Sequence, residues 1–150
     1  MYYTYTEDYI AAFYRRMNIY QPEQLNYIAI AEALNISIFY WDSPSSALFS
    51  SHFNYIILKE QKQKELLWED FCHELAHVLF HTGKQFNLTP AWISYQEQKA
   101  NYFMYHAAVP TFMLEQQSFW SVDKVAATFN VSNEFATKRL EDYVRNKQFR

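Results

Sequence analysis

Glycine and proline are scarce in this sequence of 150 residues: Gly83 is the only glycine, and there are four prolines. Linkers between domains are often rich in glycine and proline, and no such stretch or internal repeat is evident. We therefore expect one domain over residues 1–150. Within it we expect helices and a short sheet in 1–60, two central helices in 65–110 and a C-terminal helical segment in 121–150.

Cysteine is represented by Cys72 alone. A single cysteine excludes an internal disulfide and a four-cysteine metal cluster, so a metal site in this chain would need histidine and carboxylate ligands. Free cysteine is among the most buried residue types. We expect Cys72 to be a core residue and not a nucleophile.

Long apolar runs are missing as well. No segment approaches the roughly 18 to 20 consecutive apolar residues that a membrane span needs. The first residues, MYYTYTEDY, lack the basic-then-apolar order of a secretory signal, so we expect a cytoplasmic protein with no membrane partner. The formal net charge of −3 is too small to predict a nucleic acid or polyanion partner by itself.

The pattern of apolar residues predicts an α+β fold. Two β-branched and aromatic runs, 36–41 and 53–59, predict strands joined by a serine-rich loop in a small antiparallel sheet. Gly83 is expected to take the left-handed position that ends the helix before it. Helical spacing, with Thr, Pro or Ser at several starts, predicts helices at 6–17, 22–34, 65–81, 94–108, 122–129 and 133–146.

The segment EDFCHELAHVLFH, Glu69 to His81, holds three of the five histidines. At 100° per residue one face of this segment is polar, within an arc of roughly 100°, and the opposite side is apolar. The residues of the polar face are Asp70, His73, Glu74, His77 and His81. His73 and His77 stand on neighbouring turns, close enough for their imidazoles to share one ion, and Glu74 lies beside them. In this His-Glu-x-x-His arrangement the glutamate can take a proton from a water held by the ion. The alternative is a solvated helix face, but the apolar flanks favour a metal site.

A catalytic zinc ion needs a third protein ligand, since the fourth position belongs to water. The segment from Ser94 to Pro110 offers Glu97 and His106. His81 is a poor candidate, because three ligands on successive turns of one helix span roughly 12 Å; we expect it to support the site or to be structural. Glu97 has an alternative role, because Ser94 to Glu97 also fits a capping box, in which the glutamate bonds only to a backbone N–H.

Three segments resemble the ImmA/IrrE family of metallopeptidases: HELAHVLFH, EQKANYFMYHAAVP and VAATFNVSNEFATKRL. The resemblance implies a zincin-like, gluzincin-like domain with one Zn²⁺ per chain, held by His73, His77 and Glu97, and with Glu74 as general base. It also implies a site-specific endopeptidase that acts as an anti-repressor by cleaving a helix-turn-helix repressor of a prophage or mobile element. The chain resembles the compact, mobile-element type of the family, without the further C-terminal domain of longer members.

The sequence departs from the family pattern at a few positions. Ala76 stands where the family often has glycine, which a helix tolerates, since alanine is the better helix former by about 1 kcal/mol. Tyr105 and His106 stand where small and acidic residues are common. Either could donate a hydrogen bond to the tetrahedral intermediate, although we favour the alternative that both are helix surface or core. We also expect the strand around 55–58 to bind an extended substrate by strand addition.

Two other functions remain open. The protein could be a zinc-bearing binder that sequesters the repressor without cutting it. The helices at 122–129 and 133–146 also resemble a DNA-binding helix-turn-helix. From Ser121 on there are six Lys/Arg and four acids, a charge of +2 against −5 for the remainder. This excess is too mild for phosphate binding, and Asn130 stands where glycine is usual, so we do not expect direct nucleic-acid binding.

Overall fold

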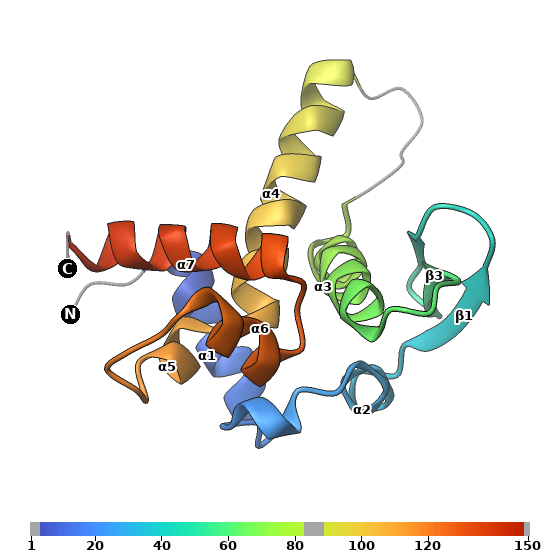
Figure 1. The fold of residues 1–150 in the computed structure, drawn as a ribbon. Helices are drawn as coiled ribbons and strands as arrows, with labels where there is room; N and C mark the ends of the chain where they lie inside the picture. Colours follow the sequence, from blue (N-terminus) through green and yellow to red (C-terminus); the bar gives the residue numbers. More distant parts are fainter. Residues whose placement is uncertain (1–3, 83–88, 149–150) are drawn as a thin grey trace. The chain divides into compact units, whose positions relative to one another are not determined.

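The computed structural model describes residues 4–82 and 89–148 (Figure 1). The predicted α+β class is confirmed. The chain divides into two compact units, one formed by Tyr27–Met104 and the other by Met1–Asn26 together with Tyr105–Arg150. Within the described residues, no helix is both long and apolar enough to cross a membrane.

The unit of Tyr27–Met104 contains a three-stranded sheet. The elements in chain order are α2 (Tyr27–Ala33), β1 (Ser37–Trp41), β2 (Ser46–Phe49), β3 (Asn54–Lys59), α3 (Lys64–Phe80) and most of α4 (Pro90–Ala108). The strand order is β1-β3-β2, with β3 parallel to β1 and antiparallel to β2. The predicted antiparallel sheet is therefore wrong in its topology. The segment predicted as a loop contains β2, which reverses the chain so that β3 enters alongside β1 in the same direction.

The core of this unit lies between the sheet and α3, which packs against β2 and β3. Ile56 and Leu58 of β3 are fully buried, as are Phe71 and Leu75 of α3. Cys72 is also fully buried, and burial raises the pKa of its thiol well above the usual value. The prediction that Cys72 is a core residue is thus confirmed. Figure 1 shows α3 lying between the sheet and α4, so that one of its faces is turned towards the sheet and another towards α4.

The other unit is helical. It contains α1 (Tyr5–Arg16), the 3-10 turn η1 (Pro22–Gln24), α5 (Thr111–Leu114), α6 (Val122–Phe129), α7 (Asn133–Lys147) and the last turn of α4. Ser121 and Ser132 cap α6 and α7 by accepting hydrogen bonds from the backbone N–H groups of Lys124 and Phe135. Between them Asn130 adopts the left-handed conformation at φ 55° and ends α6. The predicted pair of C-terminal helices is therefore present.

The single helix predicted for 22–34 is wrong, because the chain forms η1 and then α2. The side chain of Gln24 explains the break. Its Oε1 accepts hydrogen bonds from the backbone N–H groups of Tyr20 and Gln21, and its Nε2 donates to the carbonyl of Asn18. These bonds close a local turn, and Leu25 leaves it with extended backbone angles. The helical pattern resumes only at Tyr27.

A buried polar network stabilises the helical unit. Arg139 on α7 is 1% exposed; its Nε donates to the carbonyl of Val109 at 2.9 Å and its Nη2 to Thr111 Oγ1 at 2.8 Å. Thr111 Oγ1 in turn donates to the carboxylate of Glu7 on α1. Because buried charged and polar groups are costly without partners, this network ties α1, α5 and α7 to one arrangement.

Candidate metal centre

The helix α3 supplies the two histidines and ends just after them. His81 takes the left-handed conformation at φ 52°, and its backbone N–H donates to the carbonyl of His77. Gly83, which we predicted for the left-handed position, lies outside the described residues, and His81 fills that role. The helix therefore ends at Phe80, one turn beyond His77.

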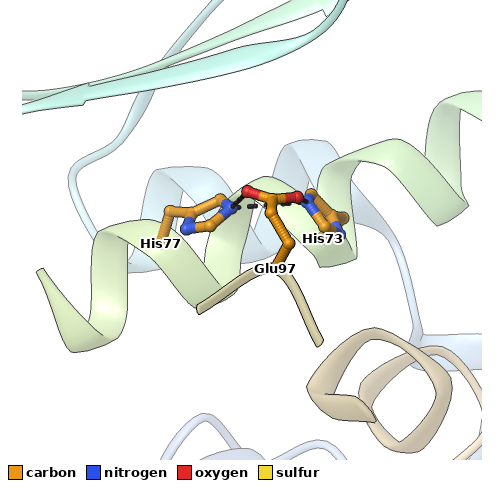
Figure 2. Close-up of side chains that lie close together, drawn as sticks. All are labelled: His73, His77 and Glu97. Carbon is orange, nitrogen blue, oxygen red and sulfur yellow. Dashed lines mark hydrogen bonds and ion pairs between the residues drawn. The ribbon is translucent and has the colours of Figure 1, made fainter. Parts of the chain in front are cut away.

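Side chains from α3 and α4 meet at one point, as Figure 2 shows. Glu97 Oε2 lies 3.0 Å from His73 Nε2, and Glu97 Oε1 lies 3.0 Å from His77 Nε2. The two Nε2 atoms are 3.3 Å apart. Among the described residues, these three form the group of histidines and acids whose ligand atoms, within 4.8 Å of one another, could hold a metal ion.

The spacing fits a tetrahedral ion. Two nitrogen ligands about 2.05 Å from one tetrahedral centre are about 3.3 Å apart, which is the separation of the two Nε2 atoms. Two imidazoles and one carboxylate are a ligand set that zinc accepts, and three protein ligands leave a fourth position for water or substrate. The side chain of Glu97 is 48% exposed, whereas those of His73 and His77 are 17% and 5% exposed. Glu97 is therefore the most exposed of the three side chains.

Burial favours the neutral form of His77. Desolvation lowers its pKa from the ordinary 6.5, and this effect outweighs the nearby Glu97 carboxylate, which raises the pKa. The imidazole is therefore neutral at physiological pH, the form in which histidine binds metals. Its other ring nitrogen, Nδ1, lies 3.1 Å from the hydroxyl oxygen of Thr82.

The helix α4 explains why Glu97 is available. It begins at Pro90, four residues before the predicted start, and Thr89 Oγ1 accepts a hydrogen bond from the N–H of Trp92 in its first turn. Ser94 and Glu97 lie inside the helix, so the capping-box interpretation is wrong. The Glu97 carboxylate extends instead from α4 to the imidazoles of α3 (Figure 2).

Two other candidates, Glu74 and His81, lie on α3 and at its C-terminal end. Glu74 follows His73 directly and is 6% exposed. The ring of His81 packs edge-to-face against Phe49 at the end of β2, with 5.3 Å between ring centroids. His81 thus fastens the end of α3 to the sheet and is not among the three clustered residues.

Tyr105 and His106 contact the C-terminal helix α7. The Tyr105 ring stacks on Phe135 with ring centroids 4.3 Å apart. His106 is buried, and its Nε2 lies 3.7 Å from the carboxylate of Asp142. The structure therefore gives both side chains packing partners on α7.

Thr82 is the contact of the cluster that sequence reasoning missed. The sequence feature that could have predicted this contact is the position of Thr82, which is five residues after His77 and just beyond the end of the helix. A residue that follows a left-handed helix end folds back over the last turn. That geometry could have been anticipated only if the left-handed position had been assigned to His81.

Comparison with known proteins supplies independent information. Residues 31–141 match the IrrE N-terminal-like domain, the family Peptidase_M78, and this span includes all three clustered residues. The Phage-like element PBSX protein XkdA of Bacillus subtilis (strain 168) is 38% identical over 151 residues, covering 97% of this chain and 76% of that protein. The uncharacterized protein YqaB of the same strain is 37% identical over 147 residues, covering 95% and 86%. No solved structure gives a significant match.

Proposed function

This chain belongs to the IrrE N-terminal-like domain family, Peptidase_M78, and on that basis we propose that it is a zinc-dependent, site-specific endopeptidase. Its substrate in this proposal is a helix-turn-helix repressor of a prophage or mobile element, which it cleaves in the cytoplasm. Cleavage allows the repressed genes to be transcribed. The similarity to a protein of a phage-like element supports this context. The observation that carries the proposal is the single carboxylate of Glu97 lying against both imidazole Nε2 atoms.

In this proposal His73, His77 and Glu97 hold one Zn²⁺. When bound, the ion would lower the pKa of a coordinated water towards neutrality and polarise the carbonyl of the scissile peptide. The neutral state of His77 and the 3.3 Å separation of the two Nε2 atoms support this ligand set.

Glu74 is the general base of the proposed reaction. It follows His73 directly on α3 and is almost fully buried, so its carboxylate is shielded from bulk water on the helix that supplies both imidazoles. Glu74 takes the proton of the attacking water and later passes it to the departing amine. Proton transfer by one positioned carboxylate contributes about 10² to 10⁴ in rate.

Substrate binding by strand addition must use a different strand from the one predicted. Residues 55–58 belong to β3, which is the central strand and is paired on both sides, so it cannot accept a further strand. Within the described residues, β2 is an edge strand, packs against α3 and contacts His81 through Phe49. We therefore propose that the extended segment of the substrate pairs with the free edge of β2.

The test is an incubation of the zinc-loaded protein with a helix-turn-helix repressor, sought first among the neighbouring genes, followed by mass spectrometry of the products. The wild type should cut one peptide bond. Glu74→Gln should retain one zinc per chain and cut at least about 100-fold more slowly. Glu65→Gln, on the first turn of the same helix, is the matched control and should cut at the wild-type rate.

Two outcomes would contradict the proposal. If Glu74→Gln cut as fast as the wild type, the mechanism would be wrong. If the zinc-loaded wild type bound the repressor and left it intact, the non-cleaving alternative would be correct.

A further inference from the structure

We infer that Thr82 is a positioning residue for the candidate metal centre: its hydroxyl oxygen accepts the Nδ1 hydrogen of His77 and so directs His77 Nε2 at the ion. The inference rests on the proposed function, since it assumes that His77 is a metal ligand. It assigns a role to a residue outside the His-Glu-x-x-His segment and outside α4.

The end of α3 brings Thr82 to His77. His81 adopts the left-handed conformation, which turns the chain back over the last helical turn. The backbone N–H groups of His81 and Thr82 both donate to the carbonyl of His77, the latter at 3.0 Å. This bonding ends the helix and at the same time sets the Thr82 hydroxyl 3.1 Å from His77 Nδ1. The same turn that ends α3 therefore also places the Thr82 hydroxyl where it can orient the imidazole of His77.

The burial of His77 makes an acceptor within the protein necessary. Its side chain is 5% exposed, against 17% for His73, so bulk water has little access to the ring. When a metal takes the lone pair of Nε2, the hydrogen of the neutral imidazole must be on Nδ1. A buried N–H without an acceptor is costly, and Thr82 Oγ1 is within hydrogen-bond distance.

The expected size of the effect follows from the general role of such contacts. Hydrogen bonds to the second nitrogen of a metal-binding histidine fix its tautomer and its ring orientation, and their loss typically weakens metal binding about 10- to 100-fold. Thr82→Val keeps the shape of the side chain and removes its hydroxyl. Thr82→Ser keeps the hydroxyl. Thr89→Val is the matched control, because Thr89 also bonds through its hydroxyl but caps α4 and does not contact an imidazole.

The experiment measures zinc affinity at neutral pH by competition with a fluorescent chelator, using the full chain and each folded variant. Thr82→Val should bind zinc about 10- to 100-fold more weakly than the wild type. Thr82→Ser and Thr89→Val should stay within about threefold of it. In the zinc-loaded protein, NMR should show a slowly exchanging His77 Nδ1–H in the wild type and in Thr82→Ser, and a faster exchange in Thr82→Val.

The outcomes separate this inference from the proposed function. If the wild type binds no stoichiometric zinc, the proposed function fails. If the wild type binds zinc and Thr82→Val matches it in both affinity and Nδ1–H exchange, the inference about Thr82 is wrong and the proposed function stands. Equal weakening by Thr82→Val and Thr89→Val would also overturn the inference, because it would reveal a general loss of stability.

Discussion

The carboxylate of Glu97 lies 3.0 Å from Nε2 of His73, although the two residues are 24 positions apart in the chain. This contact joins α4 to α3, and its second oxygen makes the equivalent contact with His77. One acidic side chain thus completes a cluster whose other members come from a single helix. The negative charge of Glu97 is what distinguishes this cluster from a pair of histidines on a helix face.

Replacement of Glu97 by glutamine should therefore weaken zinc binding at least about 100-fold, because even the loss of an outer contact to a ligand costs about 10- to 100-fold. The amide keeps the shape of the side chain and removes its charge. Chelator competition measures the affinity. Glu141→Gln, an exposed acid on α7, is the control and should bind zinc as the wild type does. Equal affinities for the two variants would exclude Glu97 as a ligand.

The sequence predicted the local part of this site better than the non-local part. A spacing of four residues on a helix fixes the relation of His73 and His77, so periodicity alone placed both imidazoles on one face. The third partner depends on how α4 packs against α3, which no local pattern encodes. From the residues alone, Glu97 could equally have capped a helix at Ser94, and only the resemblance to a family favoured it as a ligand.

The pairing of the strands is a second non-local feature that local sequence patterns did not predict. Both predicted strands exist, but their pairing was wrong because β2 has only four residues and lies in a stretch that contains serine and proline. A short edge strand carries little periodic signal. Its presence reverses the direction in which β3 meets β1, so one missed strand changed the topology of the whole sheet.

The stability of the metal-free protein should depend on pH through His77. Burial lowers its pKa below the ordinary 6.5, so the folded state binds fewer protons than the unfolded state as the pH falls through this value. The contribution of His77 to the free energy of unfolding is thus fully present above pH 6.5, and it is lost as the pH falls from 6.5 through the lower pKa of the folded state. A single group changes stability by at most about 1.4 kcal/mol per pH unit.

Urea unfolding at about pH 7.5 and about pH 5.5 measures this dependence. The wild type should lose more stability between the two pH values than His77→Gln. His52→Gln, at an exposed position in the loop between β2 and β3, controls for the loss of a histidine as such and should behave as the wild type does. Equal losses for the wild type and His77→Gln would contradict the prediction.

DNA binding by α6 and α7 should be absent. The exposed side chains of α7 carry charges of both signs, with Glu134, Lys138, Glu141 and Arg145 along its length. A surface that neutralises phosphates needs an excess of cations and gives binding that weakens steeply with salt. A gel-shift titration of operator DNA at low salt should therefore show no retarded complex. A complex that salt dissociates would favour the helix-turn-helix alternative.

The last prediction concerns Arg139 and Arg145, two arginines that share Asp142 on the same helix. Nη1 of Arg139 lies 3.7 Å from the Asp142 carboxylate and Nη2 of Arg145 lies 3.2 Å from it, but their side chains are 1% and 68% exposed. Distance alone would rank Arg145 as the stronger partner. Burial makes Arg139 the more important of the two for stability, because it also donates hydrogen bonds to the carbonyl of Val109 and to Thr111 Oγ1. Removing Arg139 leaves these two buried oxygens without that donor.

Arg139→Met should therefore lower the free energy of unfolding by about 3 to 5 kcal/mol, as breaking a buried ion pair generally does. Arg145→Met should cost at most about 1 kcal/mol, since exposed pairs contribute little. Urea denaturation of both variants measures the difference. If the two variants were equally stable, the contacts of Arg139 would have no more weight than a surface ion pair, and the arrangement of α1, α5 and α7 would have to depend on apolar packing alone.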